Sequence, residues 1–264
     1  MDGCRVDRSS WAAPGSTDMA GICGFLTFRG RLPAGESFQR AMAAIERRGV
    51  SAQLFPIGDA IALAASGSQC STPAPSTAVH GRAQAVLDGF LTNYQALRHE
   101  LASRGPELAS DSHAEAVLGL YEHYGESIAE RLEGSYAAAI WDPQSASLLL
   151  IRDRFGARPL FWFSSPEGLA FSSSLPALCA LGAPAEIDLQ AVDDYLSLGY
   201  VPAPGSIYRS IQKLPAAHAL RATCGGEVDV RRYWDVAQCG SNPPSPPPGN
   251  RTAVSLACRS PATT

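Results

Sequence analysis

The side chains of this 264-residue chain that could attack a substrate, carry a proton or hold a metal are its cysteines, histidines and carboxylates. The seven cysteines form no C-x-x-C pairs, so they indicate neither a disulfide framework nor a zinc site. The five histidines do not fall at metal-ligand spacings, and we expect no metal site. The phosphate loop G-x-x-x-x-G-K-[ST], the nucleophile elbow G-x-S-x-G and the metal pair H-E-x-x-H are also absent from the sequence. Residue types and spacing alone therefore leave the chemistry unassigned.

One charged cluster, Arg152-Asp153-Arg154, places a carboxylate between two guanidinium groups. Taken alone, such a cluster predicts a structural ion pair rather than a catalytic carboxylate. We therefore expect it to hold the fold together and assign it no catalytic role.

Residues 19–236 contain a collinear series of short motifs that resembles the amino-terminal domain of asparagine synthetases and other class II glutamine amidotransferases. The segment Met19 to Phe25 resembles the family start Met-Cys-Gly-Ile-x-Gly-Phe, and Asp88 to Tyr94 is similar to Asn-Gly-Glu-Ile-Tyr-Asn-Tyr. The segment Arg152 to Leu160 resembles Arg-Asp-Arg-x-Gly-x-Lys-Pro-Leu. The other matching segments are Arg48-Gly49, Ser112 to Glu115, Ala139 to Asp142, Gly199 to Pro204, Lys213 to Pro215 and Tyr233 to Asp235. Each motif alone is weak, but their common order makes the resemblance specific.

The resemblance implies an α+β fold of the N-terminal-nucleophile hydrolase type, a four-layer αββα sandwich with two antiparallel sheets between helical layers. In active members of the family, removal of the initiator Met exposes a cysteine. Its thiolate attacks the glutamine amide, with its own α-amine as the base. The released ammonia reaches a synthetase domain, where ATP and Mg²⁺ activate a carboxylate. We therefore expect no cofactor in this chain, and ATP with magnesium only in the synthetase domain.

The positions that match the family's glutamine pocket carry altered residues. Ala20 occupies the nucleophile position, and a methyl group cannot attack a carbonyl. Asp88 replaces an asparagine that donates to the oxyanion, whereas a carboxylate only accepts hydrogen bonds and repels negative charge. Phe90 replaces a glutamate, and His113 replaces the aspartate that holds the substrate ammonium. The degenerate pocket positions are Arg48, Gly49, Asp88, Gly89, Phe90, His113 and Glu115. We predict no catalytic residue and no glutamine hydrolysis.

Two further features of the pocket support this prediction. The arginine that would clamp the substrate carboxylate is missing near Ala64-Ala65-Ser66. Cys23 cannot replace the nucleophile, because it lies three residues after position 20 and so points to the opposite face of a strand. It also has no free α-amine, and we interpret it as a small core residue.

A degenerate pocket within matching scaffold motifs is the pattern expected of the β-lactam synthetases and lasso-peptide cyclases. These look like asparagine synthetases whose amine nucleophile comes from the substrate itself. The first hypothesis is therefore the amidotransferase-like domain of an ATP-dependent amide-forming enzyme, without glutaminase activity. The second is a non-catalytic module that docks on a separate synthetase or peptide cyclase, and the third is an inert fragment of a disrupted gene.

The spacing of apolar residues along the chain predicts the helices and strands that must position these residues. Apolar spacing indicates helices over 36–47 and 113–132, the second opened by a Ser112–Glu115 capping box. A third helix follows Asp188, with Leu189, Val192 and Leu196 pointing inward. Two hairpins are predicted, over 135–152 and 160–173, with further strands over 22–28 and 84–87. Hairpins without regular β-α-β alternation favour a layered α+β domain.

Composition excludes several classes of protein. The chain is 45% hydrophobic and carries a net charge of −4 without a basic stripe, so we expect neither global disorder nor a nucleic-acid partner. No apolar run approaches the roughly 20 residues of a membrane helix, and residues 1–18 lack the core of a signal peptide. We therefore expect a cytoplasmic location and no membrane partner. The expected partner is a synthetase domain or subunit of the same family, and an uncovered apolar surface would favour a homo-oligomer.

The two ends differ from the predicted domain at 19–236. Residues 1–18 form a polar extension, and a misassigned start codon is the simplest account because Met19 matches the family start. Residues 237–264 contain 6 of the 20 prolines and are predicted not to pack. Nothing after Trp234 resembles the Ser-Gly-Gly-x-Asp-Ser loop of a synthetase domain, which we expect to be missing. Residues 237–264 are either a natural linker or the product of frame-shifted translation, and we favour the second explanation.

Overall fold

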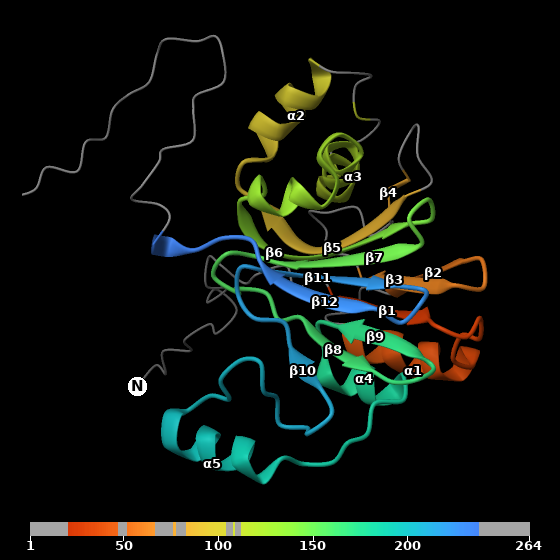
Figure 1. The fold of residues 1–264 in the computed structure, drawn as a ribbon, viewed down its shortest axis with the longest axis vertical. Helices are drawn as coiled ribbons and strands as arrows, with labels where there is room; N and C mark the ends of the chain where they lie inside the picture. The colour runs from red at the N-terminus through yellow and green to blue at the C-terminus, as the bar shows by residue number, and fades with distance from the viewer. Residues whose placement is uncertain are drawn as a thin grey trace, which may run out of the picture. The chain divides into compact units, whose positions relative to one another are not determined.

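In the residues that the computed structural model describes, the strands form two six-stranded antiparallel sheets that lie face to face (Figure 1). The described residues are 21–46, 52–66, 76–77, 83–103, 108 and 112–237. The chain divides into two units, Met1–Trp234 and Asp235–Thr264, and the fold below is that of the first. In the second unit, the backbone amide of Ala237 donates a hydrogen bond to the Asp235 carboxylate over 3.1 Å.

The first sheet contains the strand that follows position 20 in the chain. Its strand order is β10 (Gln212–Lys213), β8 (Phe161–Ser164), β9 (Gly168–Ser172), β1 (Gly21–Thr27), β3 (Ile61–Ser66) and β2 (Ala52–Ile57). β1 lies between β9 and β3, and the register pairs Gly21 with Ser66 and Cys23 with Ser172. The amino end of β1 is thus fixed by a neighbouring strand on each side.

The second sheet supplies β5, which carries three of the predicted pocket positions. Its strand order is β12 (Val228–Arg232), β11 (His218–Thr223), β7 (Ser147–Arg152), β6 (Gly134–Asp142), β5 (Gln84–Leu91) and β4 (Ser76–Thr77). On β6, Ala137 and Ala139 belong to the core between the sheets, while Tyr136 and Ile140 pack in the core under the helices. Because side chains alternate between faces and both faces are covered, β6 is a continuous apolar run.

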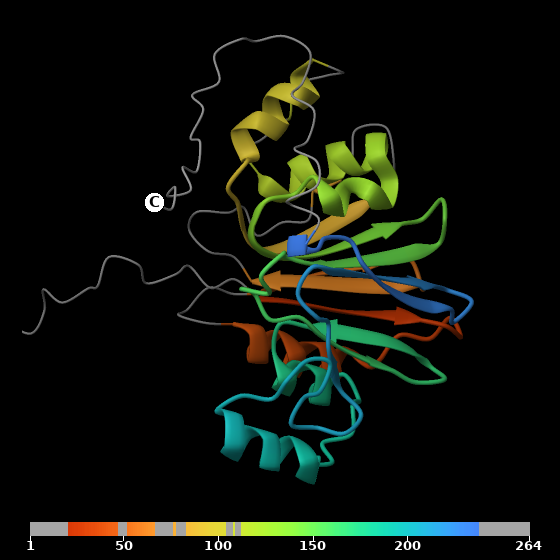
Figure 2. The ribbon, with the colours of Figure 1, turned by 60° about the vertical axis from the view of Figure 1, so that its left-hand side comes forward.

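Helices cover the outer face of each sheet. The first sheet is covered by α1 (Gly35–Ile45) and α4 (Leu175–Ala180), and the second by α2 (Tyr94–Ala102), α3 (His113–Tyr124) and the 3₁₀ segment η2 (Gly125–Glu130) (Figures 1 and 2). The layers therefore run helix, sheet, sheet, helix. This order confirms the expected α+β fold, a four-layer αββα sandwich.

The helix predicted over 113–132 ends eight residues early. Gly125 follows α3 with a φ of +54°, a backbone conformation that glycine adopts without strain, and the chain continues as η2. One half of the predicted capping box is wrong as well, because Ser112 occupies the N-cap position but its side chain makes no capping hydrogen bond.

Helix α5 (Leu189–Leu198) follows Asp188, as predicted, but two of the three residues predicted to point inward are exposed. The Asp188 carboxylate accepts a hydrogen bond from the Gln190 amide over 3.1 Å. In Figures 1 and 2 this helix lies apart from both sheets. Leu189 is 76% exposed and Leu196 78% exposed, so the inward orientation predicted for them is wrong. Apolar spacing predicts that one face of a helix is apolar, but it does not specify what covers that face.

Among the helices that the structure describes, none combines the length and the apolar composition needed to cross a membrane.

Candidate functional site

The predicted pocket positions Ala20, Arg48 and Gly49 lie outside the described residues. The site is therefore described from the amino end of β1, the end of β5, the start of α3 and the loop that follows β7. These segments contain Asp88, Gly89, Phe90, His113 and Glu115, and they also contain residues that the sequence did not single out.

Buried serine hydroxyls hold the amino end of β1. Ser66 accepts a hydrogen bond from the Gly21 amide over 2.8 Å and donates one to a carbonyl at the end of α1 over 3.0 Å. Ser173 accepts from the Ile22 amide over 3.1 Å, and Ser172 donates to the Ile22 carbonyl over 2.9 Å. These serines were not predicted, although a run of three serines at the end of an apolar strand is visible in the sequence. Since their partners here are backbone groups, they position the strand rather than supply a nucleophile.

Gly89 is required by the backbone of β5 itself. Its φ is +113°, and a Cβ atom built there would lie 2.0 Å from the carbonyl oxygen of Ser135 on β6. Both observations exclude any larger residue, because side chains rarely adopt this φ and the neighbouring oxygen is a backbone atom. The backbone of β5 therefore requires a glycine at position 89, whether or not the site is catalytic.

Asp88 forms a buried ion pair with Arg158. The Arg158 Nη1 and Asp88 Oδ1 atoms are 3.8 Å apart, and the two side chains are only 9% and 2% exposed. Asp88 projects from the face of β5 that also carries Val86 in the core between the sheets. At the position where the family resemblance implies a hydrogen-bond donor, this chain therefore holds a carboxylate compensated by a guanidinium group. The pairing was not predicted, since the two residues lie 70 positions apart.

The loop over 152–160 delivers Arg158 to this pair. The fully buried Asp153 carboxylate accepts hydrogen bonds from the backbone amides of Phe155, Ala157 and Arg158 over 3.0 to 3.1 Å. The Arg152 guanidinium donates to the carbonyls of the same loop and to that of Leu214. The role of the cluster is structural, as expected, but the partners of the Asp153 carboxylate in these bonds are backbone amides rather than an arginine.

His113 begins α3 and binds the end of β5. The Leu91 amide donates a hydrogen bond to the Nδ1 atom of His113 over 3.0 Å, so Nδ1 carries no proton in this arrangement. The imidazole also stacks on Tyr94, with ring centroids 4.5 Å apart. Burial lowers the pKa of His113, which favours the neutral ring. A neutral imidazole therefore stands where the resemblance implies an aspartate for the substrate ammonium.

The structure brings Asp88, Gly89, Phe90 and His113 to one end of β5. Phe90 is 48% exposed and presents an aromatic ring where the family has a glutamate. Glu115 lies in the first turn of α3 and is half-buried. To a ligand, this arrangement offers the aromatic ring of Phe90 and the Asp88 carboxylate, whose charge is balanced by Arg158. The Nδ1 acceptor of His113 is already occupied by a backbone amide.

None of the described cysteines is suited to act as a nucleophile. Cys23 is buried under α1 and α4, and burial raises the pKa of its thiol to about 12. Burial also raises the thiol pKa of Cys179 and of Cys224. Because the thiolate is the reactive form, these raised pKa values make the three thiols less nucleophilic at neutral pH than an ordinary cysteine. Within the described ranges, no group of three His, Cys, Asp or Glu side chains could hold a metal ion.

Comparison with known sequences relates these features to other proteins. Residues 19–234 match the sequence family described as "Glutamine amidotransferase domain". The chain is 37% identical over 163 residues to a Mycobacterium tuberculosis protein named as a glutamine-hydrolysing asparagine synthetase, a match that covers 60% of this chain and 25% of that protein. It is 30% identical over 149 residues to glutamine-hydrolysing asparagine synthetase 1 of Bacillus subtilis, covering 56% of this chain and 24% of the relative. The chain thus spans about a quarter of the length of these relatives.

Solved structures share the fold. Glutamine phosphoribosylpyrophosphate amidotransferase from B. subtilis, complexed with ADP and GMP, aligns with a TM-score of 0.60 at 14% identity, covering 81% of this chain and 49% of that one. A structure described as the allosteric regulatory enzyme of purine biosynthesis aligns with a TM-score of 0.58 at the same identity and coverage. At this identity the alignments carry the fold alone, and both support the N-terminal-nucleophile type of sandwich.

Proposed function

Because the chain belongs to the glutamine amidotransferase domain family, we propose that it is the amidotransferase-type part of an ATP-dependent, amide-forming enzyme of the asparagine synthetase kind. We propose further that this part does not hydrolyse glutamine. The observation that carries the second proposal is the buried ion pair of Asp88 with Arg158. ATP and magnesium would bind to the synthetase polypeptide, and the amine would come from the substrate or from free ammonia.

The ion pair opposes glutamine hydrolysis through its charge and its hydrogen-bonding capacity. Hydrolysis of an amide passes through a tetrahedral intermediate whose oxygen becomes negative, and donors aimed at that oxygen lower the barrier by about 3 to 4 kcal/mol each. The Asp88 carboxylate has no proton to donate and repels an oxyanion. Since Arg158 already binds this carboxylate, its charge is not available to the intermediate.

His113 adds a separate argument from the binding of substrate. A glutamine ammonium needs an anionic or carbonyl partner in a partly dehydrated pocket. The neutral His113 ring offers no negative charge, and its Nδ1 acceptor is engaged by the Leu91 amide. Together with the alanine at position 20, these features weaken both substrate binding and the chemical step.

The direct test is ammonia release from glutamine by the purified chain, with an active glutamine-hydrolysing asparagine synthetase as the positive control. We expect release at the background rate. Reproducible turnover above background would overturn the proposal that this part is inactive.

A second experiment tests whether the pocket is disabled beyond position 20. The variant Ala20→Cys, in a chain that starts at Met19 so that the cysteine becomes amino-terminal, restores the nucleophile alone. We expect it to remain inactive because Asp88 and His113 still occupy the pocket. Glutaminase activity in this single variant would show that the rest of the pocket works, and it would refute the role given to the ion pair.

The exposed surface of α5 supports a docking function for this part. Six large apolar residues that are 53–78% exposed lie on α5 and beside it. They are Ile187, Leu189, Tyr195, Leu196, Leu198 and Tyr200, and we call them the α5 surface. Large apolar residues exposed together on one element are a feature of interaction sites. Since the relatives are about four times as long as the matched segment, we propose that synthetase polypeptide of the same family covers the α5 surface.

Light scattering on the chain mixed with a synthetase polypeptide from the same genome tests this docking. The paired substitution Leu189→Asp and Leu196→Asp should abolish the complex, because it places charge within the apolar contact. Gln190→Asp is the matched control, since it adds charge to an exposed polar position of the same helix. A complex that survives the paired substitution contradicts the proposal, as does a chain that only associates with itself through this surface.

We also propose a cytoplasmic location. The described cysteines Cys23, Cys179 and Cys224 are free thiols, as expected in a reducing compartment.

A further inference from the structure

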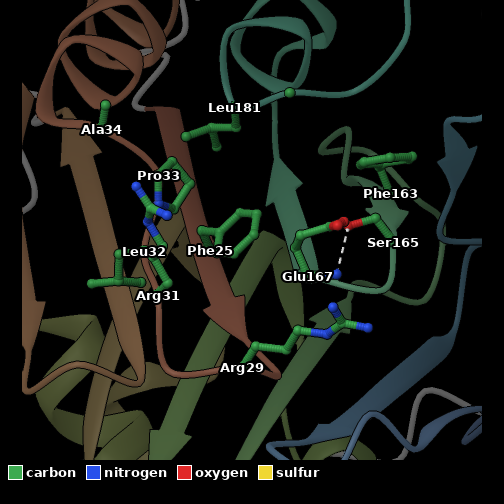
Figure 3. Close-up of a pocket in the computed structure, with 11 residues that line it drawn as sticks. Phe25, Arg29, Arg31, Leu32, Pro33, Ala34, Phe163, Ser165, Glu167 and Leu181 are labelled. Atoms are coloured by element: carbon green, nitrogen blue, oxygen red, sulfur yellow. Dashed lines mark hydrogen bonds between the residues drawn. The ribbon is translucent and has the colours of Figure 1, made fainter.

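A pocket lies at the carboxyl end of β1, whereas the predicted nucleophile position, Ala20, precedes the amino end of that strand in the chain. Its volume is about 630 Å³, within the roughly 300 to 1,000 Å³ of typical small-molecule sites. It is formed by the turn after β1, the β8–β9 hairpin and the turn after α4 (Figure 3). None of its lining residues belongs to the pocket positions inferred from the family resemblance.

The floor of this pocket is apolar. Phe25 lies at its centre, with Leu32 on one side, Phe163 on the other and Leu181 above it in the view of Figure 3. Phe25 and Leu181 are themselves buried, so their positions are fixed by the core beneath α1 and α4. A ligand that rests on this floor must present an aromatic or aliphatic body.

Charged side chains on the rim make the pocket asymmetric. Hydrogen bonds to Ser165 and to backbone lower the pKa of the Glu167 carboxyl, and the charge of Arg29 makes a smaller contribution in the same direction. Arg31 stands on the opposite side of Phe25 in Figure 3. Within the described residues, the Arg31 guanidinium has neither a hydrogen-bond nor an ion-pair partner. Among the described residues neither guanidinium is held in an ion pair, but the Glu167 carboxylate lies on the Arg29 side of the rim, so the Arg31 side is the more favourable place for an anionic ligand.

The backbone around both arginines is held in place before any ligand binds. The Thr27 hydroxyl oxygen accepts hydrogen bonds from the amides of Arg29 and Arg31 over 3.1 and 3.0 Å. The same hydroxyl donates to the carbonyl of Glu167 over 3.3 Å, which ties the turn to the β8–β9 hairpin. Ala34, the N-cap of the 11-residue helix α1, also lines the pocket, so the positive end of a helix dipole adds to the charge on the Arg31 side.

From this arrangement we infer that the pocket binds an amphipathic carboxylate. The carboxylate lies at Arg31, whose planar guanidinium can bind both of its oxygens. The apolar body extends over Phe25 towards Phe163 and Leu181. This inference is independent of the proposed function, because its residues are not part of the altered glutamine pocket.

Calorimetric titration with octanoate, 4-phenylbutyrate, 1-octanol and octylammonium tests this inference on the full chain. Both carboxylates should bind, the alcohol should bind at least tenfold more weakly, and the ammonium ion should not bind. Arg31→Gln should weaken octanoate binding tenfold or more, because a charge-assisted pair becomes a neutral contact. Ala34→Phe should abolish binding by filling the pocket from an exposed position.

Two control variants separate this pocket from other surfaces. Arg40→Gln removes an exposed arginine of α1 that does not line the pocket, and it should leave octanoate affinity unchanged. The paired substitution on the α5 surface should leave it unchanged too. Equal binding of octylammonium, unchanged affinity in Arg31→Gln, or loss of binding on changing the α5 surface would each overturn the inference.

Discussion

The loop over 152–160 and the end of β5 both match family motifs, but their side chains have different partners. In the loop, the Asp153 carboxylate and the Arg152 guanidinium bind backbone groups. At the end of β5, the Asp88 carboxylate is paired with the side chain of Arg158. A residue that satisfies buried backbone cannot change without leaving amides unpaired, whereas a residue that faces a substrate can change once that substrate is no longer used. If this part has lost glutamine hydrolysis as proposed, this difference accounts for a scaffold that persists while the pocket changes.

The largest expected effect is that of removing the Asp153 carboxylate. Asp153→Ala leaves three backbone amides without their acceptor, which should lower the free energy of unfolding by about 5 kcal/mol. Urea denaturation of the variant measures the loss. Asp153→Asn keeps an acceptor oxygen and should lose less, and the exposed Asp193→Asn should change stability little. If Asp153→Ala is as stable as the wild-type protein, the loop over 152–160 is not held by these hydrogen bonds, and it does not differ from the end of β5 in the way described.

Separating the Asp88–Arg158 pair should have the next largest effect. Arg158→Met leaves the buried carboxylate uncompensated and should cost about 4 kcal/mol. The double variant Asp88→Leu with Arg158→Met removes both charges and should recover most of that loss. A complete double-mutant cycle by chemical denaturation measures the coupling. If the double variant is as unstable as the single one, the pair does not act as a unit.

Two adjacent positions on β5 test, within one strand, the difference between a residue that the backbone requires and a residue that faces the predicted pocket. Gly89→Ala should destabilise the protein by about 3 kcal/mol, since its Cβ would meet the Ser135 carbonyl. Phe90→Glu restores the family residue at a half-exposed position and should change stability by less than about 0.5 kcal/mol. Thermal unfolding of both variants measures the contrast. A tolerant Gly89 would show that the matching glycine has no backbone role.

The smallest expected effect is a pH dependence from His113. Because burial lowers its pKa in the folded state, the unfolded chain binds the proton first as the pH falls below about 6.5. Stability should therefore decrease as the pH falls through that value, and level off below the folded-state pKa. His113→Gln keeps an acceptor for the Leu91 amide and should remove this dependence, whereas the exposed His99→Gln should not. A pH profile that is identical in His113→Gln and the wild-type protein would contradict the assignment.

The sequence predicts those parts of the fold whose signals are local. The hairpin predicted over 135–152 is β6 with β7, and the one over 160–173 is β8 with β9. The helix predicted over 36–47 is α1, within two residues at its carboxyl end. Strands β2 and β3 were not predicted, because their apolar runs show no alternation that distinguishes strand from helix.

The features of the site that were not predicted depend on distant partners. The Asp88–Arg158 pair joins residues of different strands and loops, and no local pattern specifies such a contact. The outward direction of Leu189 and Leu196 depends on what covers α5, which lies beyond the periodicity of the helix. Residue identity predicts an altered pocket, and only the fold shows that Asp88 is paired with Arg158.

The hydrogen bonds of Arg152 and Asp153 also join segments that are far apart in the chain. The Ala217 amide donates to the Asp153 carbonyl, the Tyr233 amide donates to the Ala217 carbonyl, and the Tyr233 hydroxyl donates to the Arg152 carbonyl. The segments that contain Arg152 and Asp153, Ala217, and Tyr233 should therefore unfold together as one cooperative unit rather than separately. In native-state hydrogen exchange, the amides of Ala157, Arg158, Ala217 and Tyr233 should share one opening free energy and one denaturant slope.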